Sequence, residues 1–221
     1  MEKFERVSMS KVRMVRYVYD FSAYSVPDSE IVKQIREKFK SKLLLIMCSR
    51  LIVFKRHILV FETLSALLKE KALDIKMIVL DEGPEESKLR LFIATNRLEE
   101  SIHMVGYRRD FINYMAASDL MIHPSLTEAS NSAVKEYALL EKTVAVCNEV
   151  GDFSEYILDE QNGFLMSISN TNEDIKRIIL EAYNHPEKLS AMGKQLKRGV
   201  VDKYAVSDDN FREYDQLLRW E

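Results

Sequence analysis

The feature that most constrains the fold of this sequence is the regular alternation of short apolar runs with longer amphipathic segments. The runs with the composition of buried strands are Leu43–Ser49, Ile75–Asp81, Ile102–Gly106, Asp119–Ser125, Thr143–Asn148 and Gly163–Ser167. The segments with helical spacing of apolar residues include Val60–Glu70, Glu86–Asn96 and Asn131–Glu141. This alternation predicts βαβ units, and therefore an α/β fold with a doubly wound, mainly parallel sheet that has helices on both faces.

Chain length and composition narrow the class of protein. With 221 residues, the chain can form one well-packed domain with a linker and a tail. The chain has a net charge of -3 and lacks the overall positive charge that is typical of nucleic-acid-binding proteins. No apolar run approaches the roughly 18–20 residues that span a bilayer, and the first residues carry charges where a secretory signal needs an apolar core. Cys48 and Cys147 both lie in strand-like runs, which favours packing over a disulfide and the reducing cytoplasm as location.

The two ends of the chain differ from its middle. The first 42 residues contain a predicted strand, Val12–Asp20, and a predicted helix, Ser29–Lys40. An acidic membrane could attract the basic residues Lys3, Arg6, Lys11, Arg13 and Arg16, but Glu2, Glu5 and Asp20 lie among them and favour a solvated linker. Near the other end, Thr171 with Asp174 predicts a capped helix start, Pro186 starts the next helix, and Ser207 caps the last.

A polar loop between a predicted strand and a predicted helix is the first candidate site. In a doubly wound sheet, ligands bind beyond the carboxyl ends of the strands, where this loop lies. Ser130, Asn131 or Ser132 can cap the helix, and the unpaired N–H groups of its first turn attract phosphate. Glu128 lies in the loop, and Glu136 is partly sheltered on the helix, where a carboxylate suits a vicinal diol such as ribose. Spacing alone favours a plainer interpretation, in which Glu128 complements the helix dipole and Glu136 is solvated.

A second candidate cluster follows the first strand of the middle segment. Arg50 and Lys55 lie at its carboxyl end, where two cations opposite a helix N-terminus can clamp a diphosphate. The alternative is a pair of ordinary surface cations. His57, His103 and His123 have no carboxylates at the spacing of metal ligands, so we expect them to be structural or exposed and expect no metal site.

Taken together, these segments resemble the C-terminal, donor-binding domain of GT-B glycosyltransferases, in particular the retaining family 4 (glycosyl transferases group 1). The most diagnostic pattern is a pair of glutamates separated by seven residues, which reads EASNSAVKE from Glu128 to Glu136. CSRLIVFK resembles the Arg-to-Lys diphosphate clamp of the family, and VLDEGPEESKL resembles its GxGP strand end. The resemblance extends from Leu43 to the C-terminus. The sequence departs from the family pattern at Ala129, where glycine is frequent, and at Asp81–Glu82–Gly83, where many members have glycine in place of acid.

The resemblance implies a single Rossmann-like GT-B half-domain at residues 43–205, with an interdomain linker at residues 1–42 and an extra helix at residues 206–221. It also implies a retaining transfer of a sugar from a UDP- or GDP-linked donor, without metal or other cofactor. In that reaction Glu128 would contact the donor sugar as the catalytic residue, and Glu136 would bind the ribose. The residues expected to hold the diphosphate and the sugar are Arg50, Lys55, Ala129, Ser130, Asn131 and Ser132.

The resemblance further implies that an acceptor-binding half is missing from this sequence. The chain would then be a fragment, a truncated gene product or one subunit of a split enzyme, with a separate N-terminal acceptor-domain polypeptide as partner. The expected acceptor is a glycan or glycolipid of surface polysaccharide or glycolipid synthesis, in the cytoplasm, with peripheral membrane contact as an open alternative. A non-catalytic nucleotide-sugar-binding module or pseudoenzyme also stays open, as does a GT-B epimerase, which the two residue pairs disfavour.

Overall fold

The computed structural model describes residues 17–207 and residue 212. The chain divides into two compact units, of which the larger comprises residues 24–203. In the smaller unit, Tyr19 and Ala205 form an isolated parallel bridge. The predicted strand Val12–Asp20 is therefore reduced to this bridge in its described part, and its residues 12–16 lie outside the described residues.

The larger unit is built on a six-stranded parallel sheet with the order β3-β2-β1-β4-β5-β6. The strands are β1 (Leu43–Cys48), β2 (Ile75–Leu80), β3 (Ile102–Gly106), β4 (Leu120–His123), β5 (Thr143–Cys147) and β6 (Phe164–Met166). Each coincides with a run predicted from the sequence. The order reverses between β1 and β4, as it does in a Rossmann-like sheet. The predicted doubly wound α/β fold is therefore confirmed.

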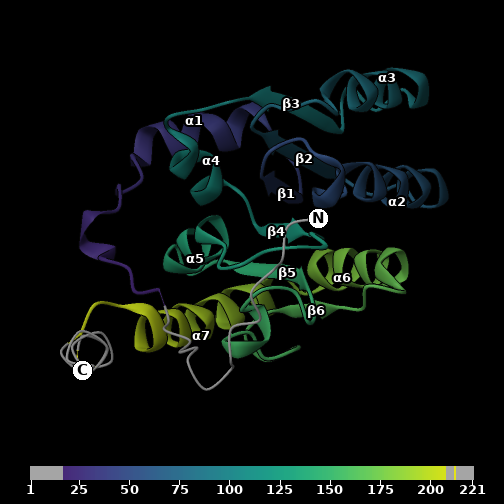
Figure 1. Cartoon of the computed structure of the whole chain (residues 1–221). Helices are drawn as coiled ribbons and strands as arrows, with labels where there is room; N and C mark the ends of the chain where they lie inside the picture. Colours follow the sequence, from purple (N-terminus) through teal and green to yellow (C-terminus); the bar gives the residue numbers. More distant parts are fainter. Residues whose placement is uncertain (1–16, 208–211, 213–221) are drawn as a thin grey trace, which may run out of the picture. The chain divides into compact units, whose positions relative to one another are not determined.

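Helices cover both faces of the sheet (Figure 1). One layer holds α2 (His57–Glu70), α3 (Glu86–Asn96) and α6 (Thr171–Asn184), with α2 in contact with the other two. The opposite layer holds α1 (Ser29–Lys38), α4 (Phe111–Ala117) and α5 (Ser132–Leu139), with α4 in contact with the other two. Because both faces are covered, the side chains of β1 from Leu43 to Met47 are at most 1 % exposed. The last described helix is α7 (Pro186–Tyr204).

The helix ends show which of the local signals in the sequence hold. Pro186 is the first residue of α7, as predicted. Asp28 caps α1 and accepts hydrogen bonds from the N–H groups of Glu30 and Ile31. Helix α6 begins at Thr171, but the Thr171 hydroxyl donates to the carbonyl oxygens of Ser167 and Ile168 and does not cap the helix. The last helix, for which Ser207 is the predicted cap, lies outside the described residues.

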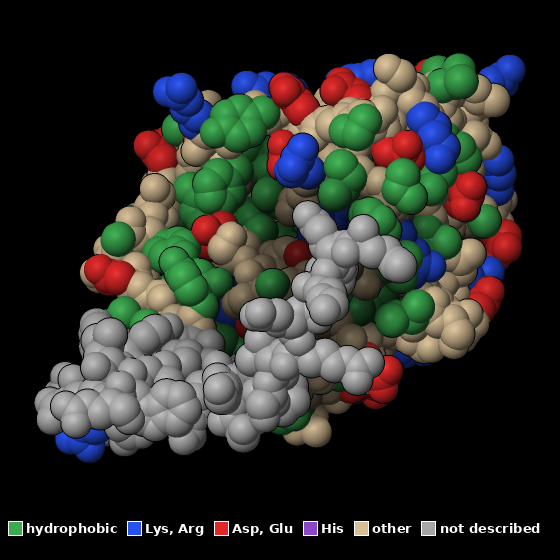
Figure 2. Space-filling view, viewed as in Figure 1, with side chains coloured by type: hydrophobic (Ala, Val, Ile, Leu, Met, Phe, Trp, Pro, Cys, Tyr) green, Lys and Arg blue, Asp and Glu red, His purple; other side chains and the backbone are tan. Residues whose placement is uncertain are grey.

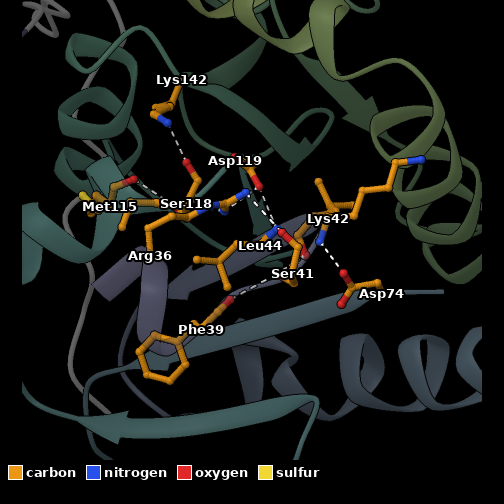
Figure 3. A network of polar contacts seen from close by, with 12 residues as sticks. Arg36, Phe39, Ser41, Lys42, Leu44, Asp74, Met115, Ser118, Asp119 and Lys142 are labelled. Atoms are coloured by element: carbon orange, nitrogen blue, oxygen red, sulfur yellow. Dashed lines mark hydrogen bonds and ion pairs between the residues drawn. The ribbon is translucent and has the colours of Figure 1, made fainter. Parts of the chain in front are cut away.

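A polar network fixes α1 to the amino ends of β1 and β4 (Figure 3). The Arg36 guanidinium donates to Asp119 Oδ2 at 2.8 Å, and the N–H group of Leu44 donates to the same oxygen at 2.8 Å. Lys142 donates to the carbonyl oxygen of Ser118 at 2.7 Å. Helix α1 therefore packs with the larger unit, which starts at Tyr24.

Acidic and basic side chains alternate over the visible face (Figure 2). Among the described residues, no helix combines the length and apolar character needed to cross a bilayer. The two cysteines are both free, with Cys48 half-buried at the end of β1 and Cys147 buried at the end of β5.

Candidate functional site

The candidate site lies where the strand order reverses, between the carboxyl ends of β1 and β4. The connections that leave these two strands run in opposite directions, to α2 and to α5. A crevice therefore opens between the two loops, and it is the usual ligand position in sheets of this kind. The polar network around Arg36 and Asp119 lies at the amino ends of the same strands, so it is at the opposite edge of the sheet.

A cavity of about 380 Å³ occupies this edge of the sheet, within the size range of small-molecule sites. Its lining comes from the carboxyl ends of β1, β2 and β3 and from the first turns of α4 and α5. The lining residues are Cys48, Ser49, Arg50, Lys55, Leu80, Asp81, Tyr107, Arg108, Phe111, Asn131, Ser132, Ala133 and Glu136. Arg50 and Lys55 follow β1, whereas the lining that follows β2 and β3 combines apolar and aromatic residues with Asp81 and Arg108.

The loops after β1 and β2 are joined by their backbones. The N–H group of Leu51 donates to the carbonyl oxygen of Glu82 at 3.0 Å, and that of Glu85 donates to the carbonyl oxygen of Leu51 at 3.0 Å. Gly83 allows this close approach, because a Cβ atom there would lie 2.5 Å from the carbonyl oxygen of Leu51. The contact brings Arg50 and Asp81 to the same cavity.

Glu128 forms the centre of a compact polar cluster with Lys55 and His123. The Lys55 ammonium donates to Glu128 Oε1, and His123 Nε2 lies 2.6 Å from the same oxygen. All three side chains are well covered, with exposed fractions of 15 % for Lys55, 10 % for Glu128 and 1 % for His123. Lys55 also lines the cavity, whereas Glu128 and His123 do not. An ammonium has three donors, so Lys55 can bind Glu128 and a ligand together.

The cluster keeps Glu128 ionised. Burial by itself raises the pKa of Glu128, but the hydrogen bonds from His123 and Lys55 outweigh burial and lower this pKa from 4.5 to about 2. Burial lowers the pKa of His123, which favours the neutral imidazole with its proton on Nε2 for donation to Glu128. Glu128 is therefore a fixed negative charge at the edge of the cavity.

The first turn of α5 presents free backbone N–H groups to the cavity. Asn131 is the N-cap, and its side-chain oxygen accepts a hydrogen bond from the N–H group of Val134 at 2.9 Å. Ser132 and Ala133 follow it and line the cavity. Their N–H groups are not used within the helix, and they carry the positive end of its dipole. This turn can accept a phosphate group.

Glu136 lies one turn further along α5 and faces the cavity. Its side chain is half-buried, and burial raises its pKa. Burial is the one cause of this shift, with no hydrogen bond or charge from the described residues contributing to it. Burial raises the pKa of the Cys48 thiol to about 12, and the charges of Glu136 and Asp81 add to this effect, so both carboxylates lie near Cys48. Glu136 is thus an open acceptor for hydroxyl groups of a ligand.

The loop after β5 supports the loop that carries Glu128. Gly151 has a φ angle of 56°, and a Cβ atom there would lie 2.9 Å from Glu128 Cβ. Asp152 Oδ2 accepts hydrogen bonds at 2.8 Å from the Lys135 ammonium and at 2.8 Å from the Ser130 hydroxyl. Lys135 is only 1 % exposed, so this ion pair is buried and joins α5 to both loops.

The structure brings together most of the site residues predicted from the sequence, but in two groups. Arg50, Lys55, Asn131, Ser132 and Glu136 line one cavity. The predicted residues outside its lining are Glu128, Ala129 and Ser130, since Glu128 turns to Lys55 and His123, and Ser130 turns to Asp152. The sequence analysis missed His123 as a partner of Glu128, the Lys135–Asp152 pair, and the cavity residues Asp81, Tyr107, Arg108 and Phe111.

Signals for two of the missed contacts are visible in the sequence. Lys135 interrupts the apolar stripe of the helix at a position that faces the core, and a buried lysine needs an acidic partner. Asp81 directly follows a buried strand at the edge where the site lies. His123 gives no such signal, because a histidine at the end of a strand is compatible with many environments. Among the described residues, no group of three or more histidine, cysteine or acidic side chains is arranged to hold a metal ion.

His57 next to this cluster predicts a loss of stability in weak acid. His57 is 2 % exposed, and burial lowers its pKa from 6.5 to about 4, helped by the charge of Lys55. The folded pKa lies below the unfolded one, so stability falls as the pH drops from 6.5 towards 4, because the unfolded chain binds the proton first. We expect the unfolding free energy to be about 2 kcal/mol lower at pH 5 than at pH 7 because of His57.

Urea denaturation at pH 7 and pH 5 measures this effect. His57→Gln should reduce the difference between the two pH values, whereas the same change at the exposed His185 should leave it as in the wild type. An unchanged difference in the His57 variant would show that other groups cause the acid sensitivity.

Comparison with solved structures identifies similar folds. HepE of Anabaena, in its crystal structure with UDP and glucose, superposes with a TM-score of 0.80 at 19 % identity, covering 94 % of this chain and 57 % of HepE. TarM of Staphylococcus aureus, in a mutant crystallised with UDP and glycan ligands, gives 0.72 at 20 % identity, covering 81 % of this chain and 36 % of TarM. The C-terminal domain of a glycosyl transferase group 1 protein from Francisella tularensis gives 0.72 at 18 % identity, covering 86 % of this chain and 100 % of that domain. The fold is therefore that of a GT-B half-domain.

Sequence comparison points to the same group of proteins. An uncharacterised glycosyltransferase of Methanocaldococcus jannaschii is 28 % identical over 192 residues, which cover 84 % of this chain and 47 % of that protein. The poly(ribitol-phosphate) alpha-N-acetylglucosaminyltransferase of Staphylococcus aureus is 23 % identical over 158 residues, which cover 72 % of this chain and 32 % of that protein. The chain thus spans half or less of the length of these curated relatives. The sequence model described as "Glycosyl transferases group 1" matches residues 28–199, and this chain therefore belongs to the glycosyl transferases group 1 family.

Proposed function

We propose that the cavity binds the nucleoside diphosphate of a nucleotide sugar, and that the chain is the donor-binding part of a retaining glycosyltransferase. The observation that carries the proposal is that Arg50, Lys55, the first turn of α5 and Glu136 line one cavity where the strand order reverses. Cations and free N–H groups suit a diphosphate, and a half-buried carboxylate suits the hydroxyl groups of ribose. The family membership of the chain supports this interpretation.

In this proposal the charge of the departing diphosphate is met by Arg50, Lys55 and the N–H groups at the start of α5. Arg50 is exposed at the rim and supplies a planar fork of donors, and Lys55 supplies a point charge that Glu128 holds in place. These groups are already arranged before the reaction, so they can stabilise negative charge on the leaving group without further ordering. Glu128, fixed by His123 and Lys55, would contact the donor sugar next to this diphosphate.

The acceptor would bind outside the described cavity. We propose a glycan or glycolipid acceptor, held by a second, acceptor-binding domain across the cleft, with the reaction in surface polysaccharide or glycolipid synthesis on the cytoplasmic side of the membrane. Two similar proteins support a glycan acceptor. TarM has been crystallised with glycan ligands, and the sequence relative from Staphylococcus aureus is named as a poly(ribitol-phosphate) alpha-N-acetylglucosaminyltransferase.

Titration calorimetry with UDP and GDP tests the proposal. We expect at least one of them to bind the 221-residue chain, and we expect Lys55→Ala or Glu136→Ala to weaken that binding by about 10-fold or more, because each removes a charge-assisted contact. Lys40→Ala is the matched control, since Lys40 is exposed and precedes the amino end of β1. The proposal fails if neither nucleotide binds, or if the control weakens binding as much as Lys55→Ala.

A further inference from the structure

We propose that Asp81 reads the base of the bound nucleotide and selects guanine, so that the donor is a GDP-linked sugar. This inference rests on the proposed function and adds the substrate class of the same site. Asp81 directly follows β2 and lines the cavity together with Tyr107 and Glu136.

The order of groups along the cavity places the base at the Asp81 end. The phosphate-binding groups lie over β1 and the start of α5, which follows β4, and Glu136 lies one turn along α5. The exit of β2 is two strand spacings from that of β4, or roughly 10 Å. A nucleotide with its diphosphate at α5 and its ribose at Glu136 therefore extends its base over the exits of β2 and β3. Besides Asp81, the lining there consists of Leu80, Tyr107, Arg108 and Phe111, and the apolar and aromatic surfaces among them suit a planar base.

The backbone fixes Asp81 next to the aromatic part of this wall. Its N–H group donates to the carbonyl oxygen of Gly106 at 3.0 Å, and Tyr107 follows Gly106 in the chain. Asp81 has a φ angle of 86°, a left-handed conformation that glycine adopts without cost and that other residues adopt with strain. An acidic side chain thus occupies a strained backbone position on the cavity wall.

The carboxylate of Asp81 is oriented and still has an acceptor to spare. Its Oδ1 accepts a hydrogen bond from the N–H group of Glu82 at 2.8 Å, which holds the side chain against its own loop. This hydrogen bond uses Oδ1, so Oδ2 remains available to accept from a ligand. A carboxylate is an acceptor only, so a base that faces it must present donors.

Guanine meets this requirement better than the other common bases. It presents two adjacent donors, N1–H and the 2-amino group, to one carboxylate. Uracil presents a single N3–H group between two carbonyl oxygens, which a carboxylate repels, and adenine presents only its 6-amino group. A site that accepts hydrogen bonds discriminates against a ligand that lacks the donors, because the bound base covers the half-exposed Asp81 carboxylate and leaves it unpaired.

Calorimetric titration of the 221-residue chain with GDP, IDP, UDP and ADP tests the inference, since IDP is GDP without the 2-amino group. We expect GDP to bind about 10-fold or more tightly than IDP and UDP. In Asp81→Asn, GDP affinity should fall to about that of IDP, while UDP affinity should not fall, because the repulsion between the carboxylate and the uracil carbonyl oxygens is removed. In Asp81→Gly, the same loss of GDP preference should occur without a fall in melting temperature, because glycine relieves the backbone strain.

The possible failures separate the two claims. If UDP binds as tightly as GDP, or if Asp81→Asn weakens all four nucleotides equally, the base assignment is wrong while the proposed function stands. If none of the four nucleotides binds the wild-type chain, the proposed function is wrong, and the base assignment falls with it.

Discussion

Gly193→Ala should destabilise the protein by about 3 kcal/mol, because the added methyl group has no room. Gly193 lies inside α7, where the helix packs on the turn between α5 and β5. A Cβ atom there would lie 2.0 Å from the carbonyl oxygen of Glu141 and 2.5 Å from its carbonyl carbon. Both atoms belong to the backbone of a tight turn, in which Glu141 has a φ angle of 59°, so neither can move aside easily. The measurement is the unfolding free energy from urea denaturation.

Gly199, two turns further along the same helix, provides the control. The nearest atom to a Cβ there, the carbonyl oxygen of Tyr156, would be at 3.5 Å, an ordinary van der Waals distance. Gly199→Ala should therefore stabilise the protein by up to about 1 kcal/mol, the usual gain from alanine in a helix. Equal effects of the two substitutions would mean that α7 does not pack on the Glu141 turn as described.

Lys135→Met should lower the unfolding free energy by about 3 kcal/mol, because it leaves the charge of Asp152 without its main partner. Lys135 is 1 % exposed and Asp152 is 13 % exposed, and their charged groups are 2.8 Å apart. Methionine fills a similar volume, so the loss reports the unpaired carboxylate and not a cavity. Burial lowers the pKa of Lys135, and the charge of Asp152 opposes this effect, so the pair depends on both members.

A double substitution and a surface pair complete this test. Lys135→Met combined with Asp152→Asn should recover part of the loss, because the second change removes the unpaired charge. Lys176→Met breaks an ion pair of the same length, 2.8 Å, to Glu70 at the surface, and it should change the stability little. If the double variant is as unstable as the sum of the two single variants, the buried ion pair is not the source of the effect.

The strands and helices of the sheet could be predicted because each is specified by local pattern. Continuous apolar runs such as Leu43–Cys48 arise when both faces of a strand are covered, and this is the situation in β1. Helix α3 begins and ends at the predicted residues, Glu86 and Asn96. The cavity residues at strand exits, Arg50 and Lys55, were also predictable, because parallel strands bring their carboxyl ends to one edge of the sheet.

Contacts between distant segments could not be predicted from one sequence. The bond between Lys55 and Glu128 joins residues 73 positions apart, and nothing local to either residue selects the other. This hydrogen bond gives Lys55 two roles, because Lys55 lines the cavity and also holds Glu128 beside the cavity. The contact between Arg36 and Asp119, which lie 83 positions apart, could not be predicted for the same reason, and it joins α1 to the sheet.

The most direct test of the central claim is a crystal structure of the 221-residue chain with a bound nucleoside diphosphate. We expect density for the diphosphate between Lys55 and the N–H groups of Ser132 and Ala133, and we expect the ribose hydroxyl groups to donate hydrogen bonds to the Glu136 carboxylate. A nucleotide bound at the amino ends of the strands, or with its phosphates away from Lys55 and the start of α5, would contradict the central claim.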